Sequence, residues 1–337
     1  RISSEGRMKN ILFLFSLLIL FASCADEKLI ESNDDIELSK AMGSAADSTF
    51  DRADKVIEFE FPKDHGQHPN FKTEWWYFTG NLISKEGDEF GYQFTIFRTA
   101  LTSRKEERES EWNSNQIYMG HFAVTHISSG EFYFDEKFSR EGNQLAGAEI
   151  NPVEIWLEDW RIDQVGNQFY FDLPKLQLTA NSKNYSIDLT LKAVKPKVLQ
   201  GDQGLSRKGK QVGNASYYYS YTRLETEGAL TIDGKSFTVK GYSWMDREWS
   251  TSALDDDQAG WDWFALQLNG NTEIMYYQMR KKEGSADIFS KGIFVDENGK
   301  SELLKRDDVS LEVKDYWTAP TGNRYPSGWT IEIPNEN

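Results

Sequence analysis

The stretch WWYFTGNL at residues 75–82 has a second version later in the chain, WDWFALQL at residues 261–268. Both begin with tryptophan, have phenylalanine fourth and end on leucine. The segments that follow also align, with YQFTIFR at residues 92–98 over IMYYQMR at residues 274–280, both ending on arginine. The connecting loop is four residues shorter in the second version, which a hairpin loop tolerates at low cost. Two consecutive segments that agree in register predict a duplicated domain.

Both aromatic segments are expected to be strands, in which successive side chains point to opposite faces. One face of the first carries Trp75 and Tyr77, and the aligned face of the second carries Trp261 and Trp263. Such rings fit either the wall of a barrel that binds an elongated apolar ligand or a structural core, and periodicity leaves both open. Glu74, directly before the first segment, is either a proton donor whose pKa is raised by burial or the partner of an arginine in an ion pair. The candidate ligand-binding residues are Glu74, Trp75, Trp76, Tyr77, Trp261, Asp262 and Trp263.

From residue 56 onward the chain consists of short β-rich runs, with turn signals between most of them. Asp-Gly in TIDGKS at residues 231–236 and Asn-Gly in DENGKS at residues 296–301 are typical of tight hairpins. We therefore expect an all-β protein of two tandem antiparallel β-barrels packed together, one over residues 56–200 and one over residues 201–337. Only 76 residues follow Trp261, so the second barrel is expected to be truncated at its C-terminus.

Composition excludes several classes of function. The formal net charge of -16 argues against a nucleic-acid partner, because phosphates require a basic surface. The four histidines have no metal-ligand spacing and no cysteines beside them, so no metal site is expected. Neither a phosphate-binding loop, a dinucleotide fingerprint nor a nucleophile elbow is present, so we expect no cofactor and no serine hydrolase.

The N-terminal segment predicts export. Met8-Lys9 precedes a twelve-residue apolar run at residues 11–22, which is too short to span a bilayer and is typical of a signal peptide. The Ala-Ser-Cys ending at Cys24 resembles a bacterial lipobox, in which the cysteine is diacylated; an ordinary thiol near a cleavage site is the alternative. Residues 1–23 are thus expected to be a signal peptide with upstream readthrough. Residues 24–55 are expected to be a lipidated flexible tether on the bacterial cell envelope, at the outer membrane or its periplasmic face.

The segment GYSWMDREWSTS at residues 241–252 combines acids, arginine and aromatic rings. On a strand, Trp244, Asp246 and Glu248 share one face, and Arg247 lies on the other. An aspartate between rings can be a proton donor near neutral pH, because burial raises its pKa. The alternative is an ion pair with an arginine that holds the end of a strand. The segment itself leaves both readings open.

Five segments together resemble the AttH / carotenoid 1,2-hydratase family. They are HPNFKTEWWYFTGNL (68–82), VLQGDQGLSRKG (198–209), NASYYYSYTRL (214–224), GYSWMDREWS (241–250) and GWDWFALQL (260–268). The resemblance runs from about residue 59 to the end of the chain and implies two lipocalin-like barrels. In the hydratases an acid protonates a carotenoid double bond and water captures the cation.

The resemblance implies Asp246 as this acid and Trp244 as the aromatic residue beside it. Tyr217 and Tyr219 stand where the hydratases use histidine and tryptophan, a departure that puts carotenoid hydration itself in doubt. The catalytic candidates are therefore Asp246, Tyr217, Tyr219 and Trp244.

Sequence and resemblance together predict an envelope-anchored lipocalin-like protein that binds an elongated apolar, lipid- or isoprenoid-like ligand. If it is an enzyme, acid-catalysed hydro-lyase chemistry is expected. The first alternative is a lipid-binding or transport lipoprotein without catalysis, and the second is a structural envelope protein. The expected contact with the membrane is through the N-terminal lipid only. The sequence leaves the oligomeric state open.

Overall fold

The computed structural model describes residues 49–103, 110, 114–166, 173–251 and 254–334. Within these ranges the regular structure is strand, apart from three short 3₁₀ turns at Lys63–His65, Gly142–Gln144 and Arg306–Asp308. The all-β prediction is confirmed. No helix in these ranges is long and apolar enough to cross a membrane. The expected signal peptide, Cys24 and most of the tether lie outside the described residues.

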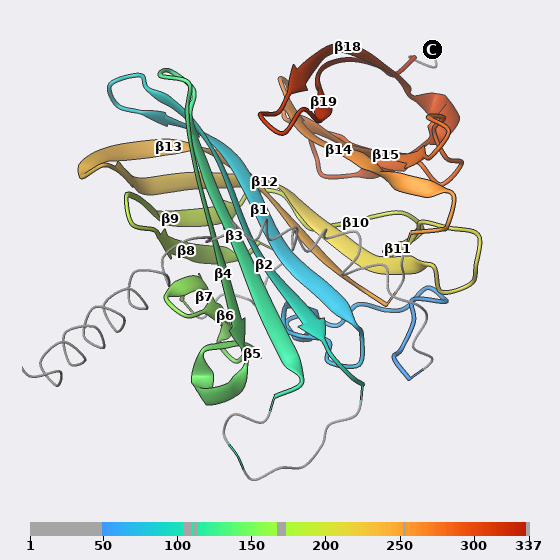
Figure 1. The fold of residues 1–337 in the computed structure, drawn as a ribbon, viewed down its shortest axis with the longest axis horizontal. Coiled ribbons are helices and arrows are strands. Elements are labelled where there is room, and N and C mark those ends of the chain that lie inside the picture. The colour runs from blue at the N-terminus through green and yellow to red at the C-terminus, as the bar shows by residue number, and fades with distance from the viewer. Residues whose placement is uncertain (1–48, 104–109, 111–113, 167–172, 252–253, 335–337) are drawn as a thin grey trace, which may run out of the picture. The chain divides into compact units, whose positions relative to one another are not determined.

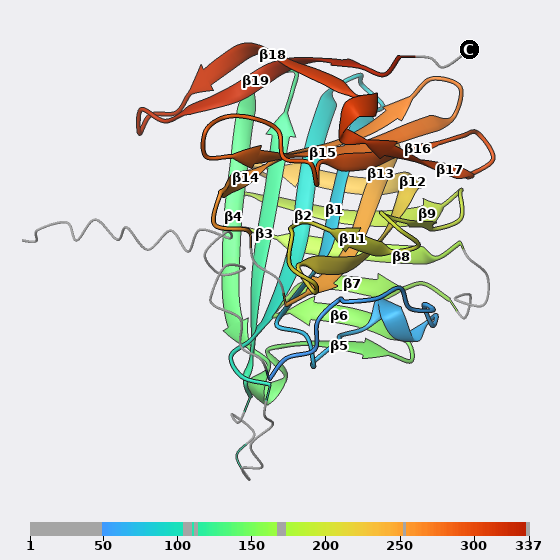
Figure 2. The same ribbon diagram turned by 90° about the vertical axis from the view of Figure 1, so that its right-hand side faces the viewer.

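The largest sheet has thirteen antiparallel strands (Figures 1 and 2). Eleven lie in the order β4-β3-β2-β1-β13-β12-β9-β8-β7-β6-β5, and β10 and β11 pair with β12. The strands are β1 (Thr73–Ser84), β2 (Glu89–Ala100), β3 (Gln116–His126), β4 (Glu131–Arg140), β5 (Ala146–Ile150), β6 (Val153–Leu157), β7 (Trp160–Gln164), β8 (Lys175–Asn181), β9 (Tyr185–Ala193), β10 (Val198–Leu199), β11 (Leu205–Arg207), β12 (Ala215–Ile232) and β13 (Lys235–Ser250).

The sheet curls around one apolar core to which most of its strands contribute (Figure 1). The ring of Trp160 on β7 lies 5.9 Å from Phe94 on β2 and 5.8 Å from Phe122 on β3, between ring centroids, although these strands are distant in the sheet order. Trp160 and both phenylalanines are fully buried. This burial of large side chains provides the main stabilisation of the barrel.

The repeat continues in a second, four-stranded sheet in the order β14-β15-β16-β17. Its strands are β14 (Gln258–Leu268), β15 (Thr272–Lys281), β16 (Lys291–Val295) and β17 (Ser301–Lys305). Trp75 pairs with Phe97 in the first hairpin, and the aligned Trp261 pairs with Met279 in the second. The register predicted by the alignment is confirmed. A two-stranded ribbon, β18 (Ser310–Thr318) and β19 (Arg324–Glu332), shares an apolar cluster with this sheet, in which the rings of Phe264 and Trp329 lie 5.3 Å apart.

Strands β12 and β13 form the longest hairpin and belong to the large sheet. Asp233 and Gly234 at its turn both have positive φ, 47° and 81°, as the Asp-Gly signal predicts. The expected domain boundary at residue 200 falls between β9 and β12, which pair with each other. The division of the chain into domains at that residue stays a prediction.

A buried ion cluster joins the two sheets. Glu273 on β15 accepts hydrogen bonds from Arg223 Nε on β12 at 2.5 Å and from Lys195 Nζ at 2.8 Å. Thr222 adds a third donor at 3.3 Å. All four side chains are buried, and Glu273 is fully so. Because the carboxylate of Glu273 bonds to a cation on β12 and to Lys195, the cluster fixes the four-stranded sheet against β12 and gives each buried cation an ionic partner.

Candidate functional site

The site centres on Asp246 in β13, which lies between β1 and β12 in the large sheet. The backbone of Asp246 is paired with Tyr77 on one side and with Ser220 on the other. Directly opposed residues in an antiparallel sheet project from the same face. The carboxyl group therefore lies on the face of the sheet that carries Tyr77, and it is buried.

Three uncharged groups donate hydrogen bonds to this carboxyl. Ser220 Oγ lies 2.5 Å and Trp244 Nε1 2.7 Å from Asp246 Oδ1, and the Tyr218 hydroxyl donates to the same carboxyl. Burial raises the pKa of Asp246 to about 7, and the three donors oppose this rise without cancelling it. Asp246 is therefore a carboxyl that can hold or release a proton near neutral pH.

Aromatic rings from four strands surround the carboxyl. Besides Trp244 and Tyr218, Tyr77 on β1 lies edge-on to Trp263 on β14, with ring centroids 5.3 Å apart. Trp263 Nε1 also donates to the Tyr218 hydroxyl at 3.4 Å. A chain of hydrogen bonds thus runs from the second sheet through Tyr218 to Asp246. Trp261 and Ala265 lie on the same face of β14 and pack against the same apolar cluster.

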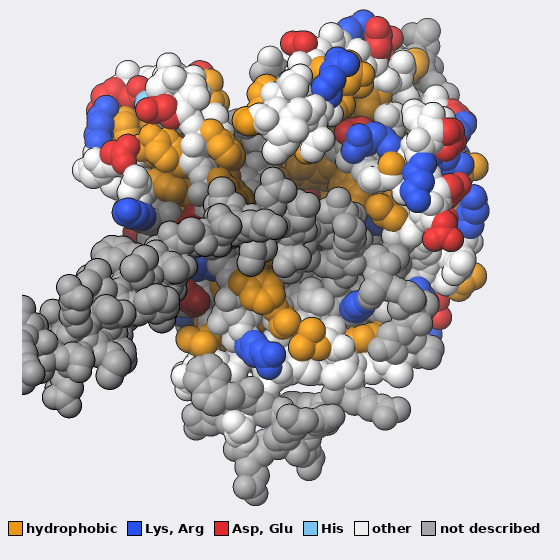
Figure 3. All heavy atoms as spheres, viewed as in Figure 1, with side chains coloured by type: hydrophobic (Ala, Val, Ile, Leu, Met, Phe, Trp, Pro, Cys, Tyr) orange, Lys and Arg blue, Asp and Glu red, His pale blue; other side chains and the backbone are white. Residues whose placement is uncertain are grey.

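The aromatic face continues across β1 to β4, away from Asp246. Trp75 lies 6.3 Å from Phe97, Phe97 lies 5.3 Å from His121, and His121 lies 5.7 Å from Phe134, all between ring centroids. Trp75, Phe97 and His121 are half-buried, and Phe134 is 51% exposed. In the view of Figure 3, apolar side chains are likewise exposed between charged outer rims. We use the name aromatic face for this row together with Trp263, whose ring contacts that of Tyr77. The aromatic face thus consists of Trp75, Tyr77, Phe97, His121, Phe134 and Trp263.

Glu74 and Trp76 lie on the opposite face of β1, inside the barrel. Both are fully buried. Glu74 forms ion pairs with Arg98 and Arg247. Burial alone would raise the pKa of Glu74, but the two guanidinium groups outweigh it and hold this pKa well below its usual range. Trp76 donates to the His65 carbonyl at 2.8 Å and lies under Arg247. The structure therefore does not bring these two candidates together with Trp75 and Tyr77.

Tyr217 and Tyr219 also point into the barrel, away from Asp246. The Tyr217 hydroxyl donates to the Lys55 carbonyl at 2.9 Å, and the Tyr219 hydroxyl lies 2.6 Å from His65 Nδ1. Burial lowers the pKa of His65 to about 3, with Arg247 adding to the effect, so this histidine is neutral. The tyrosine beside Asp246 is Tyr218, which sequence reasoning missed.

Asp262 lies on the face of β14 opposite to Trp261 and Trp263, because adjacent strand residues alternate. Its carboxylate is 3.4 Å from Arg280 Nε. The structure thus brings Trp75, Tyr77, Trp244, Asp246, Trp261 and Trp263 to one side of the large sheet and places Glu74, Trp76, Tyr217, Tyr219 and Asp262 elsewhere.

Two charged residues that are not among the candidates also lie beside the site. Glu248 shares the face of β13 that carries Asp246, is buried, and forms an ion pair with Lys208. Lys208 Nζ lies 5.6 Å from the ring centroid of Trp75 and 6.0 Å from that of Tyr218. Strand parity already placed Glu248 on the face of Asp246, as the structure has it. Tyr218, Ser220 and Lys208 required the register between β12 and β13 and the course of the preceding loop.

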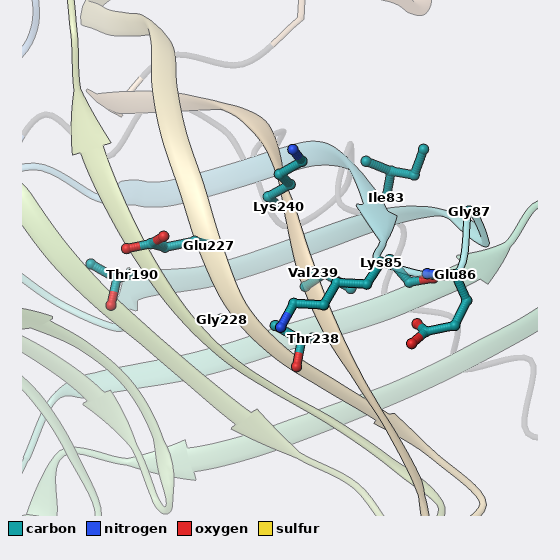
Figure 4. Close-up of a pocket in the computed structure, with 11 residues that line it drawn as sticks. Ile83, Lys85, Glu86, Gly87, Thr190, Glu227, Gly228, Thr238, Val239 and Lys240 are labelled. Carbon is teal, nitrogen blue, oxygen red and sulfur yellow. The ribbon is translucent and has the colours of Figure 1, made fainter.

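A separate open hollow lies at the end of the β1–β2 hairpin (Figure 4). Its volume is about 850 Å³, and Lys85, Glu86, Glu227 and Lys240 are among its lining residues. None of the lining residues is aromatic. Among the described residues, no group of three or more His, Cys, Asp or Glu side chains is arranged to hold a metal ion.

Comparison with known proteins agrees with this architecture. The family model described as AttH-like matches residues 52–337. The crystal structure of an AttH protein from Nitrosomonas europaea is similar at 30% sequence identity, covering 83% of this chain and 82% of its own, with a TM-score of 0.72. Kievitone hydratase from Nectria haematococca is similar in fold at 14% identity, covering 85% and 82%, with a TM-score of 0.59. The search of curated proteins gave no match. On its sequence match and its fold, this chain belongs to the AttH-like family.

Proposed function

We propose that this protein binds an elongated apolar ligand along the aromatic face and that Asp246 exchanges a proton with it. One observation carries the proposal: a buried carboxyl with a pKa of about 7 lies among rings from β1, β12, β13 and β14. Half-buried rings offer contact area to an apolar chain, and their faces attract a cation that forms on it. A carboxyl with this pKa can donate a proton and take it back.

The reaction that fits this arrangement is the addition of water to a carbon–carbon double bond. The Asp246 carboxyl transfers its proton to one alkene carbon and becomes a carboxylate, and a carbocation forms at the other carbon. The oxygen of water bonds to that carbon, and the proton that it releases returns to the carboxylate. Atoms and charge balance without a cofactor. Kievitone hydratase supports this proposal only through its fold, since its identity to the chain is 14%.

Replacement of Asp246 by asparagine tests the catalytic part. Native mass spectrometry of protein from cell envelopes would first identify the co-purifying ligand, and turnover would be followed by incorporation of oxygen from labelled water. We expect Asp246→Asn to abolish turnover and to keep ligand affinity, because the amide preserves the shape of the side chain but is not acidic enough to protonate an alkene. Asp307→Asn, at an exposed carboxylate, is the matched control. Unchanged turnover in Asp246→Asn would exclude the assignment.

The second candidate function is ligand binding or transport without chemistry. It is favoured by the position of Tyr217 and Tyr219, since neither of the residues that stand for the histidine and tryptophan of the hydratases reaches Asp246. The same experiment separates the two functions: a binding protein retains the ligand and shows no turnover even with Asp246 intact. Absence of any co-purifying apolar molecule would instead favour a structural envelope protein.

We further propose that the protein acts at the bacterial cell envelope, anchored by lipid on Cys24. The support is the sequence of residues 8–24, in which a basic start, an apolar run and Ala-Ser-Cys follow in the order of a lipoprotein signal. This location would place the aromatic face close to lipids and other apolar molecules.

A further inference from the structure

Lys291 is a half-buried cation on the inner side of the four-stranded sheet. It begins β16 and is paired with Tyr277 on β15. Its side chain shares a strand face with Ile293 and Val295, which belong to the apolar cluster of Trp244 and Tyr218. Lys291 therefore projects from the face of the second sheet that packs against the Asp246 side of the large sheet.

Lys208 reaches the same place from the loop after β11. Its Nζ lies 5.9 Å from the Tyr277 ring centroid, and it also approaches Trp75 and Tyr218. The Tyr277 hydroxyl lies 3.0 Å from Ser206 Oγ, which ties β15 to β11. Tyr277 thus lies near Lys208 through its ring and pairs with Lys291 through its backbone, so both lysines lie in the neighbourhood of this residue.

Around Lys291 and Lys208, positively charged side chains outnumber negatively charged ones. Glu248 pairs with Lys208, but among the residues that the structure describes no carboxylate lies within 4.0 Å of Lys291 Nζ. Burial, with smaller contributions from the charges of Lys208 and Arg207 and against an opposing effect of Asp202, lowers the pKa of Lys291 to about 8. A desolvated cation beside two others is costly unless an anion compensates it.

The cations lie at the inner end of the aromatic face. Glu248, the partner of Lys208, is two residues from Asp246 on the same face of β13, a separation of about 7 Å along the strand. Trp75, which Lys208 approaches, is two residues from Tyr77 on β1. Glu248, Trp75 and Phe97 are directly opposed across β13, β1 and β2. A molecule with one end at the lysines would therefore lie along Trp75 and Phe97, with Asp246 and Tyr77 beside it, two residues along the same strands.

We propose that Lys291 and Lys208 bind the anionic head group of an amphiphilic ligand whose apolar chain lies along the aromatic face, an inference that rests on the function proposed above. The ligand class is then a carboxylate- or phosphate-bearing lipid or isoprenoid rather than a neutral hydrocarbon. The head group would supply the negative charge that compensates Lys291, and Asp246 would lie beside the first part of the chain, next to Trp75.

Binding of dodecanoate and dodecan-1-ol, two ligands with the same chain, tests the inference at pH 7 by tryptophan fluorescence. We expect the intact protein to bind dodecanoate the more tightly. Lys291→Met should weaken dodecanoate binding by about tenfold and leave dodecan-1-ol unaffected, since one ion pair is lost. Lys291→Arg should keep the preference, and Lys300→Met, at an exposed lysine in the β16–β17 turn, should match the intact protein.

Three results would overturn the inference, each for a different reason. Equal affinity for the acid and the alcohol would reject the head-group site and leave the proposed apolar binding standing. Acetate competing as well as dodecanoate would show a site for small free anions. Binding of neither long-chain ligand would reject the proposed function and the inference together. Circular dichroism of Lys291→Met checks that this variant folds. A substitution of Lys208 is less suitable, because it would leave the buried carboxylate of Glu248 without its partner.

Discussion

Two buried carboxyls on adjacent strands show how partners decide the charge of a group. Glu74 and Asp246 are both buried, and burial alone raises the pKa of each. Glu74 is in contact with two guanidinium groups and stays ionised. Asp246 has only neutral hydrogen-bond donors around it and reaches a pKa of about 7. Full charges compensate desolvation, and dipoles compensate only part of it. The strand face on which each acid lies therefore decides its role. Glu74 faces two arginines and is a structural ion-pair partner, whereas Asp246 faces neutral donors and can be protonated.

The pKa of Asp246 predicts how folding stability depends on pH. Its pKa is raised from 3.8 in the unfolded chain to about 7 in the fold, so the folded state binds more protons between these values. The contribution of Asp246 to the free energy of unfolding should then fall as pH rises from about 4 to 7, by about 1.4 kcal/mol per pH unit and on the order of 4 kcal/mol in all. Urea unfolding of the intact protein and Asp246→Asn at pH 5 and pH 8 measures this.

The free energy of unfolding of Asp246→Asn minus that of the intact protein should be larger at pH 8 than at pH 5. The reason is that the intact protein loses the proton of Asp246 over this range and the variant does not. Other titrating groups contribute equally to both proteins and cancel in the difference. A difference that stays the same at both pH values would mean that Asp246 titrates as it does in the unfolded chain.

Removal of the Tyr218 hydroxyl should move the pKa of Asp246 further. Tyr218 donates to the carboxyl and thereby lowers the pKa, so Tyr218→Phe should raise it above about 7. The carboxyl-carbon chemical shift of Asp246, assigned with Asp246→Asn, can be followed by NMR from pH 4 to pH 9. Tyr217→Phe, whose hydroxyl bonds to the Lys55 carbonyl, should leave that titration in place. A fall in pKa in Tyr218→Phe would contradict the proposed donor.

At the level of elements, the ion cluster around Glu273 predicts what holds the four-stranded sheet to β12. Glu273→Gln keeps the side-chain volume but leaves Arg223 and Lys195 buried without their carboxylate. We expect a loss of about 3–5 kcal/mol in the free energy of unfolding, measured by urea denaturation. Glu283→Gln, at an exposed glutamate, should change it by less than about 0.5 kcal/mol. Equal stability of the two variants would mean that apolar packing alone joins the sheets.

Alternation and repeat register were predictable because both depend on short segments. The pairing of Trp75 with Phe97 and of Trp261 with Met279 follows from two hairpins whose sequences align. The strand face that becomes the barrel interior was not predictable from β1 alone. Trp76 is core because the loop at residues 65–71 and Arg247 cover it, and these contacts come from distant parts of the chain.

At the scale of the whole molecule, the family and the all-β architecture could be predicted, and the assembly of the site could not. The site depends on β1 pairing with β13, which joins Thr73 to Ser250, and on β12 pairing with β13 in a register that shifts between Tyr221 and Leu224. That shift begins at Tyr221, directly after Ser220 and three residues after Tyr218. Alternation along SYYYSY (residues 216–221) separates Tyr218 from Tyr217 and Tyr219. Without the register between β12 and β13 it does not say which of them lies beside Asp246.

The location of the molecule is predicted from residues outside the described structure. The two acyl chains proposed on Cys24 would bind a membrane stably, whereas the formal net charge of -16 of the whole sequence offers no attraction to anionic lipid. We expect the intact protein to sediment with membranes and to resist a high-salt wash, and Cys24→Ser to appear in the soluble fraction. Immunoblots of fractionated cells measure both. Sedimentation of Cys24→Ser would reject the lipid anchor, and release of the intact protein by salt would point to a protein partner at the membrane instead, because salt weakens ionic contacts and leaves acyl chains inserted.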